Sequence, residues 1–370
     1  MKLKYSTKVI AFYLPQFHPI PENDKWWGTG FTEWTNVGKA IPLFNGHYQP
    51  RVPTDLGYYD LRIPEVREAQ ACLAREAGVE AFCYWHYWFG NGKQLLEKPL
   101  TDVIQSGKPD FPFCLAWANH SWERKDWNAD TNHLSSEVLI RQEYMGVEDI
   151  DKHFYTLLPV FKDNRYYRVK GKLLFVLYLV RDIPDLKLFI DRWNLLSEEN
   201  SLPGFYFIAQ GTSPKDLEDP AYQICDGINL TLRMNAFGKN LFERKAKALI
   251  SMVLRRPINT VDYRKAVRVY CDPVFKKDRV YPTILPNWDH SPRSGVSATI
   301  MHNSRPEYFR EHVKNVLDII KHKPDDDRLV FLKSWNEWAE GNYMEPDIRF
   351  GRGYIKALKM ALTESEGFGT

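Results

Sequence analysis

The stretch FLKSWNEWAEG (Phe331–Gly341) joins an apolar run to a dense group of polar and aromatic residues. The run shows little alternation of apolar and polar positions, which is typical of a strand covered on both faces. The polar group follows directly, so the strand ends where reactive and hydrogen-bonding side chains begin. This is the arrangement found at the carboxyl ends of strands in α/β barrels. The fold therefore depends on whether similar runs recur upstream.

Short apolar runs rich in Val, Ile, Phe and Tyr do recur along the whole chain. Each is a candidate for a strand buried on both faces. The eight candidates are Lys8–Leu14, Val79–Trp85, Phe113–Ala118, Leu173–Tyr178, Phe205–Gln210, Asp226–Leu230, Tyr281–Pro286 and Leu329–Ser334.

Amphipathic helical patterns separate most of these runs. Apolar residues recur at helical spacing over Ile150–Phe161, Leu186–Leu196, Phe309–Ile320 and Ile355–Leu362. Pro64, Pro184 and Pro306 fall near expected helix starts, where a missing N–H costs little. The connection Pro214–Ile224 allows only a short helix. Eight strands alternating with helices predict an α/β fold, a single (β/α)8 TIM-type barrel over residues 1–370, because eight parallel strands close such a barrel.

Two long connections interrupt this pattern, residues 15–63 after the first strand and residues 239–279 before the seventh. Loops of this length are usually functional or disordered. The first is dense in Trp, Gly, Asn and Pro, and its aromatic content argues against disorder. We treat both as insertions in one catalytic domain.

The second insertion is strongly basic, with 12 Lys or Arg against 4 Asp or Glu in residues 239–279. Its Leu241–Leu254 segment predicts a helix with an apolar side surrounded by basic residues. One interpretation is a solvated outer face. The other is peripheral contact with an anionic membrane surface or a lipid-linked glycan.

Composition narrows the class of protein. The 370 residues include 44% hydrophobic residues and carry a net charge of +3, which is ordinary for a soluble globular protein and does not indicate a nucleic-acid partner. The five cysteines are scattered without CxxC spacing, as expected in a reducing compartment. No signal peptide or transmembrane segment is visible, so we expect a cytoplasmic location, with the inner membrane surface as an alternative. Nothing predicts an obligate protein partner.

Glu337 and Glu340 are the candidate catalytic residues. On a continuing strand their side chains would point to opposite faces, whereas on a helical turn residues i and i+3 share a face with Cβ atoms about 5–6 Å apart. That separation suits glycosidic chemistry with retention, and close carboxyls push their pKa values apart into an acid and a base. The alternative is a pair of solvated loop glutamates.

Aromatic and polar side chains gather at the expected carboxyl ends of at least five strands, and the chain holds 12 Trp and 20 Tyr. Any single one could belong to a packed rim. A cleft that stacks sugar rings and hydrogen-bonds their hydroxyls explains the whole group directly. The candidate substrate-binding residues are Tyr13, His18, Trp85, His86, Tyr87, Trp117, Asn119, His120, Trp122, Tyr178, Gln210, Asn287, Trp288, Asp289, Trp335, Asn336 and Trp338.

Motifs for metals and nucleotides are missing from the sequence. His18, His86, His120 and His290 could gather around an ion, but no HExxH or similar ligand spacing is present. No GxGxxG follows a strand, and neither GxxxxGK[ST] nor GxSxG occurs. We therefore expect no metal and no cofactor.

Several longer strings resemble a known family. They are FYLPQFH (12–18), END with WWG (22–28), GFTEW (30–34), FCYWHYWF (82–89), WAN (117–119) and WNEWAEG (335–341). These resemble the WbsX-type family, which is described as glycosyltransferases of polysaccharide and O-antigen biosynthesis clusters. The barrel of that family is similar to glycoside hydrolase family 99, the endo-α-mannosidases and endo-α-mannanases. The resemblance runs from about Val9 to Asp347.

The resemblance implies a mechanism without metal. By the ExxE motif, Glu337 would take the proton of the sugar 2-hydroxyl, which attacks C1 to give a 1,2-anhydro sugar, and Glu340 would be general acid and then base. The residues alone would have indicated a glycosyl-enzyme instead. The sequence departs from the family at His120, where a Glu is usual, and this replaces a fixed negative charge with a titrating donor.

Three functions follow as hypotheses. The first is a retaining endo-glycosidase acting on α-linked, mannan-like or related polysaccharide. The second is a glycosyltransferase of cell-surface polysaccharide biosynthesis. The third is a non-catalytic glycan-binding barrel.

Overall fold

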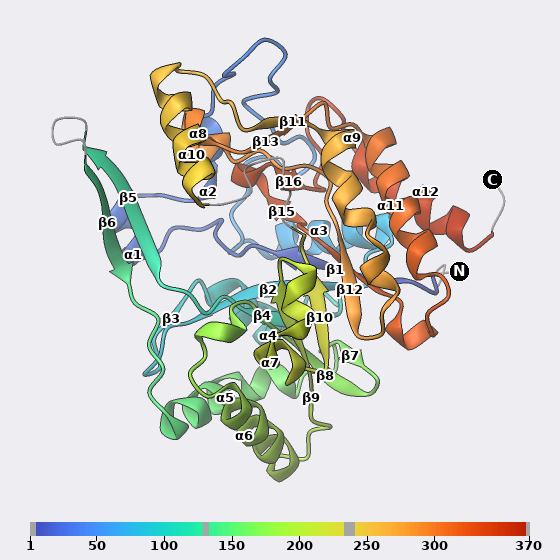
Figure 1. The fold of residues 1–370 in the computed structure, drawn as a ribbon. Coiled ribbons are helices and arrows are strands. Elements are labelled where there is room, and N and C mark those ends of the chain that lie inside the picture. Colours follow the sequence, from blue (N-terminus) through green and yellow to red (C-terminus); the bar gives the residue numbers. More distant parts are fainter. Residues whose placement is uncertain (1–4, 129–132, 233–240, 368–370) are drawn as a thin grey trace.

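A closed barrel of eight parallel strands lies at the centre of the computed structural model, which describes residues 5–128, 133–232 and 241–367 (Figure 1). Successive barrel strands pair side by side, and β1 pairs with both β2 and β14, which closes the sheet. The barrel strands are β1 (Lys8–Tyr13), β2 (Ala81–Trp88), β4 (Phe113–Trp117), β8 (Lys172–Leu177), β9 (Phe205–Gly211), β10 (Gly227–Leu230), β12 (Val280–Ile284) and β14 (Leu329–Leu332). This confirms the predicted (β/α)8 barrel and all eight candidate strands.

Helices cover the outside of the barrel between successive strands. Several begin with proline in the first turn, as the sequence indicated for Pro64 and Pro306. The connection through Pro214–Ile224 holds only short helical turns, as expected. The covering helices are α3 (Pro64–Ala77), α4 (Lys98–Ser106), α5 (Val147–Phe161), α6 (Leu186–Glu199), α7 (Pro220–Gln223), α11 (Pro306–Ile320) and α12 (Gly353–Ser365).

The remaining elements decorate the loops. The long connection after β1 holds two short helices, and the basic insertion holds α8 with short elements behind it. The bounds are α1 (Pro21–Trp27), α2 (Glu33–Gly38), β3 (Gln94–Leu95), β7 (Arg168–Val169), α8 (Leu241–Val253), β11 (Thr260–Asp262), α9 (Tyr263–Ala266), α10 (Ser291–Ser294), β13 (Ile300–His302), β15 (Asn336–Glu337) and β16 (Asn342–Tyr343).

A long projecting hairpin was not predicted from the sequence. After β4 the chain forms an antiparallel hairpin, β5 (Trp122–Asn128) and β6 (His133–Ile140), which projects from the body of the molecule (Figure 1). Its two strands carry many charged and polar residues and no continuous apolar run, so they lack the pattern that predicts a buried strand.

Aromatic rings fill the barrel between β1, β2 and β14. Phe12 stacks on Trp85 at a centroid distance of 4.9 Å and on Phe331 at 5.4 Å. The next residue, Tyr13, faces the other way and donates its hydroxyl to Gln70 on α3 at 2.7 Å. Because side chains alternate along a strand, Phe12 faces the lumen and Tyr13 the helix layer.

The loop of residues 15–63 packs against the turn after β14. The indole of Trp34, on α2, lies 5.4 Å from that of Trp338 between ring centroids, and Pro53 forms a bridge with Asp347. This long connection is therefore an ordered rim beside the candidate acids.

Candidate active site

The two candidate acids lie on one short turn directly after β14. Glu337 is the last residue of β15, and Glu340 ends a 3-10 helix (Trp338–Glu340). Glu337 is the N-cap residue of this turn, and Glu340 is its last residue. The two carboxyl groups hydrogen-bond each other. The helical turn that the spacing argument required is present.

The surroundings shift the pKa values of the two acids in opposite directions. Burial raises the pKa of Glu337, and the negative charge of Glu340 raises it further. Burial acts in the same sense on Glu340, but the nearby guanidinium of Arg293 outweighs it and lowers that pKa. The surroundings therefore favour a shared proton on Glu337 over one on Glu340. The roles implied by the family resemblance require the opposite arrangement, with Glu337 ionised and Glu340 protonated.

Arg293 connects the acid pair to the rim. Its guanidinium donates to Glu340 at 2.5 Å and to Glu33 at 2.7 Å, and the Glu33 side chain is only 1% exposed. Glu33 begins α2, Arg293 lies on α10, and Glu340 follows β14. Three loops that are distant in sequence therefore meet at one cation, whose side chain is 28% exposed.

Aromatic side chains from β2 border Glu337. The indole N–H of Trp85 donates to its Oε1 at 2.9 Å. Tyr87 lies close enough for Glu337 and Glu340 to raise the pKa of its phenol, after burial as the main cause. Trp122, at the start of β5, packs edge-on against Tyr87 with centroids 5.2 Å apart. These three rings lie together beside Glu337 and form one wall of the candidate site.

A second wall forms from the ends of β4, β8, β12 and β14. Tyr178 packs edge-on against Trp85 at 5.6 Å, and His120 lies 5.4 Å from Tyr178 between ring centroids. The ammonium of Lys333 lies 5.1 Å above the Trp288 ring. Burial lowers the pKa of His120, so this residue offers a neutral imidazole where the family usually carries an acid.

Other candidates on the same strands face away from the acids. His86 alternates with Trp85 and Tyr87 and points outward, where its Nε2 lies 2.8 Å from that of His153 on α5. Trp117 likewise packs on His153, with ring centroids 4.9 Å apart. His86, Trp117 and Tyr13 therefore pack between the barrel and its helices, and the prediction that they bind substrate is corrected.

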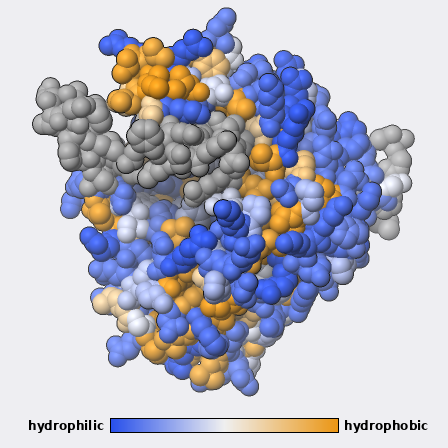
Figure 2. Space-filling view, viewed as in Figure 1, coloured by the Kyte–Doolittle hydropathy of each residue, from blue (hydrophilic) through white to orange (hydrophobic). Residues whose placement is uncertain are grey.

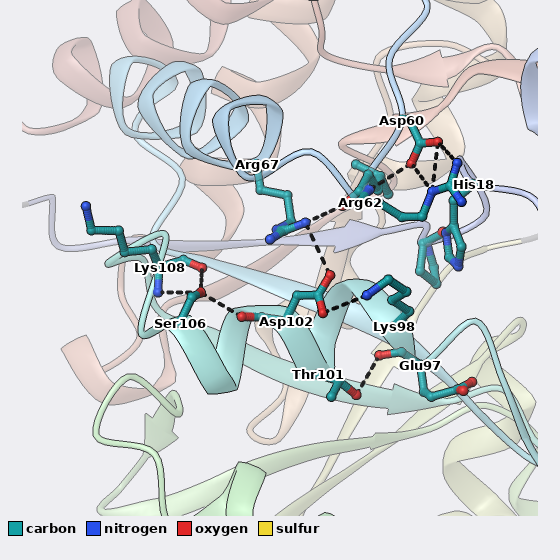
Figure 3. A network of polar contacts seen from close by, with 12 residues as sticks. His18, Asp60, Arg62, Arg67, Glu97, Lys98, Thr101, Asp102, Ser106 and Lys108 are labelled. Carbon is teal, nitrogen blue, oxygen red and sulfur yellow. Dashed lines mark hydrogen bonds and ion pairs between the residues drawn. The ribbon is translucent and has the colours of Figure 1, made fainter.

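Trp335 and His18 are also placed outside the site. Trp335 is fully buried against Phe82, with centroids 5.5 Å apart. His18 is buried in the loop after β1, within reach of the Pro15 carbonyl at 3.1 Å, and lies beside Asp60 (Figure 3). The contacts of both residues are therefore with the surrounding protein and not with Glu337 or Glu340.

Three further candidates use their polar atoms to hold loops. Asn119 donates to the Leu179 carbonyl at 2.8 Å and joins the ends of β4 and β8. Asn336 accepts from the Leu14 N–H at 2.8 Å and so joins β14 to β1. Trp338 donates to buried Glu345 at 2.7 Å. Because these groups are already bonded within the protein, they position the turn instead of facing a ligand.

Asp289 is the anchor of the rim. Its carboxylate accepts from His47 and from Gln49, each at 2.8 Å, and lies 3.6 Å from Arg51. Its side chain is 1% exposed. The loop after β12 is thereby fixed to residues 47–51, and Asp289 is corrected from a substrate contact to a structural one.

The last two candidates lie near the mouth without a contact to the acids. Gln210 donates to Asn229 on the neighbouring strand at 3.3 Å. Asn287 is buried directly after β12. Sequence reasoning missed Arg293, Glu33 and Lys333, although Lys333 lies in the stretch that decided the fold and Arg293 follows the aromatic end of the seventh run.

Gly341 allows the turn to close against the rim. Its φ is +68°, and a Cβ there would lie 2.8 Å from the Cβ of Asp289 and 2.9 Å from its nitrogen. We expect Gly341→Ala to destabilise the protein by about 1–3 kcal/mol and to lower turnover, because the turn must move away from Asp289. Urea unfolding and steady-state kinetics measure the two effects.

Gly351→Ala is the matched control for Gly341→Ala. Gly351 also has a positive φ, +50°, but nothing lies within 4 Å of its Cβ position. Gly351→Ala therefore measures the effect of the positive φ alone, without a steric clash. Equal losses in the two variants would show that the contact with Asp289 has no special importance.

Two structural searches cover the described residues only. Within residues 5–128, 133–232 and 241–367, His, Cys, Asp and Glu side chains do not converge in any group of three or more suited to a metal. Across the same ranges, every helix is too short or too polar to cross a membrane.

Solved structures with a similar fold are carbohydrate enzymes or are described as resembling them. The endo-alpha-mannosidase of glycoside hydrolase family 99 from Bacteroides thetaiotaomicron superposes with a TM-score of 0.57 at 15% identity, covering 98% of both chains. A protein described as glycoside hydrolase-like gives a TM-score of 0.57 at 14% identity, covering 98% of this chain and 95% of its own. At such identity these similarities concern the fold alone.

Sequence comparison reaches a family. The protein WxcX of Xanthomonas campestris pv. campestris is 34% identical over 366 residues, which is 98% of this chain and 50% of WxcX. The chain thus spans about half the length of the curated relatives that it matches. The profile of the family described as Glycosyltransferase WbsX matches residues 9–358. Since that match covers nearly all of the sequence, the chain belongs to the WbsX glycosyltransferase family.

Proposed function

We propose that this chain is a carbohydrate-active enzyme that cleaves or transfers α-linked sugars, with Glu337 and Glu340 as its reacting acids. One observation carries the proposal. Two hydrogen-bonded carboxyls with oppositely shifted pKa values lie at the carboxyl end of a barrel, between walls of Trp and Tyr. Glycosidic bond cleavage needs a proton donor and a proton acceptor or nucleophile within one site.

The proposed roles follow the family 99 pattern. Glu337 accepts the proton of the sugar 2-hydroxyl while that oxygen attacks C1, and Glu340 donates its proton to the departing glycosidic oxygen. A 1,2-anhydro sugar forms and the C1–O bond to the leaving group breaks. Glu340 then takes a proton from water or from an acceptor hydroxyl, whose oxygen attacks C1. The C1–O2 bond opens, and O2 recovers its proton from Glu337.

These roles require the shared proton to move first. The surroundings of the two acids favour the proton on Glu337, whereas the reaction needs it on Glu340. A sugar supplies both reasons for the shift. Its 2-hydroxyl donates to Glu337 and stabilises the carboxylate there, and its glycosidic oxygen accepts from Glu340 and stabilises the acid there. The proton crosses through the hydrogen bond that already joins the two.

The retaining endo-glycosidase is the preferred activity, and a glycosyltransferase is the second candidate because the family carries that description. The two differ in the group that leaves C1 in the first step, a sugar oxygen or an activated phosphate, and in the oxygen that attacks C1 in the second step, from water or from an acceptor sugar. Purified protein is incubated with α-mannan and related oligosaccharides, with and without sugar nucleotides, and products are resolved by mass spectrometry. Hydrolysis without nucleotide supports the glycosidase, and product only with donor supports the transferase. Binding without turnover supports a non-catalytic barrel and contradicts the proposal.

We expect a broad bell-shaped pH profile, because only the singly protonated pair is active. The raised pKa of Glu337 sets the alkaline limb, and the lowered pKa of Glu340 sets the acid limb. Arg293→Met removes the nearest cation from Glu340, so the pKa of Glu340 rises. We expect the acid limb of kcat/KM to move up by roughly 1–3 pH units.

Arg293→Lys is the control for that shift. It keeps a positive charge between Glu33 and Glu340 but loses the planar fork that reaches both. The acid limb should stay near its original pH even if turnover falls. An acid limb that Arg293→Met leaves in place would show that Arg293 does not set the charge of Glu340.

A further inference from the structure

The carboxyl end of α8 exposes a cluster of large apolar side chains. Leu249 is 52% exposed, Ile250 47%, Val253 76% and Leu254 59%. Residues at positions i, i+1, i+4 and i+5 form one continuous stripe on a helix. Figure 2 shows this region as an apolar surface over α8 at the top of the view. Single exposed apolar residues are ordinary, but four adjacent ones indicate a docking surface. We call these four residues the α8 tip.

The charges beside the α8 tip favour an anionic partner. Arg255 and Arg256 follow it directly, and both are exposed. The sequence has no Asp or Glu between Glu243 and Asp262, while Arg244, Lys245 and Lys247 stand in the same interval. A second copy of the chain would bring the same basic residues against each other. An apolar tip with a basic surround matches instead a bilayer that contains anionic lipid.

The α8 tip belongs to the same end of the molecule as the acid pair. The other side of α8 packs on a short turn, Gly295–Ser297, that directly follows α10 and therefore Arg293. Ser251 fixes the helix end, because it is fully buried and accepts from the Ile258 N–H at 3.1 Å. Figure 1 shows α8 beside α10 and α2, the elements that carry Arg293 and Glu33.

We propose that the α8 tip inserts into an anionic membrane surface and holds the mouth of the barrel beside it. The apolar side chains enter the boundary between headgroups and acyl chains, and the flanking arginines bind lipid phosphates. Combined with the proposed function, on which this second part rests, the substrate is a glycan carried at that surface. A soluble oligosaccharide would reach the acid pair without the membrane.

The test is vesicle flotation of the protein without any sugar. Vesicles of phosphatidylcholine alone are compared with vesicles that contain about one third phosphatidylglycerol, at low and high salt. We expect binding to the anionic vesicles only, weakened by salt as charges are screened. The double variant Val253→Asp with Leu254→Asp should lose at least about tenfold in binding, since it places charge where apolar side chains insert.

The matched control is Leu195→Asp. Leu195 is 45% exposed on α6, which lies far from α8 in Figure 1, so this variant should bind as the original chain does. Equal binding to both vesicle types, negligible binding to both, or equal losses in the two variants would overturn the proposal. So would a concentration-dependent dimer that the double variant abolishes, because a second copy would then cover the α8 tip.

Turnover of a soluble oligosaccharide separates this inference from the proposed function. The double variant should leave that turnover unchanged. Vesicle binding without turnover by the original chain contradicts the proposed function alone. Turnover without vesicle binding contradicts the membrane inference alone.

Discussion

Replacing Glu337 or Glu340 with glutamine is expected to lower turnover by at least about a hundredfold, the usual effect of removing a general acid or base. Glutamine keeps the shape of each side chain. The Trp85 N–H can still donate to an amide oxygen at position 337, and Arg293 keeps its second partner Glu33. We therefore expect native circular dichroism from both variants. Near-original turnover in either one would remove that residue from its role.

An activated substrate separates the two roles. With an aryl glycoside whose leaving group needs no protonation, Glu340→Gln should recover much of its first-step rate, whereas Glu337→Gln should stay slow because the 2-hydroxyl still needs a base. The opposite pattern would mean that Glu340 is the base and Glu337 the acid. The raised pKa of Glu337 and the lowered pKa of Glu340 favour that arrangement. This measurement therefore tests whether a bound sugar moves the proton.

Asp289→Ala is expected to destabilise the protein by about 3–5 kcal/mol, the usual effect of breaking a buried charge pair from one side. The variant leaves His47, Gln49 and Arg51 without their shared acceptor beneath the rim. The midpoint of urea unfolding at neutral pH measures the loss. Asp191→Ala is the matched control, since its pair with Lys187 is exposed and should change stability by less than about 1 kcal/mol.

The loss should also depend on pH. Although burial raises the pKa of Asp289, the hydrogen bond from His47 and the charge of Arg51 hold it below its usual range. A lowered pKa in the folded state stabilises the protein above the pKa of the unfolded chain, near 4, and the stabilisation disappears as pH falls through the folded value. The difference between Asp289→Ala and the original chain should therefore shrink in acid. A constant difference would contradict the ionised state of Asp289.

The barrel could be predicted from sequence because its strands are buried on both faces. Each candidate run coincides with a barrel strand within a few residues, and closure between β1 and β14 follows from their number. The β5–β6 hairpin was not predicted, because a hairpin that projects into solvent does not need a run of apolar residues. The rule that identified the buried strands could not identify an exposed one.

The site was predicted less completely, for the same physical reason. A run that is apolar on both faces does not reveal which alternate residues point inward, so His86 and Trp117 were chosen along with Trp85 and Tyr87. The contacts of Arg293 with Glu33 join positions 260 residues apart in the chain. Local spacing carries no information about such contacts, whereas it does determine the relation of Glu337 to Glu340.

That both acids lie on a single turn has a consequence for how the enzyme could diversify. Their mutual geometry is inherited from four consecutive residues and not from the docking of two separate loops. The segments after the strands that supply the outer part of the aromatic walls, with Trp122, Tyr178 and Trp288, can then be exchanged or lengthened to suit new glycans while the acid pair is preserved. Directed evolution of specificity in this scaffold should randomise those segments and leave residues 337–341 intact.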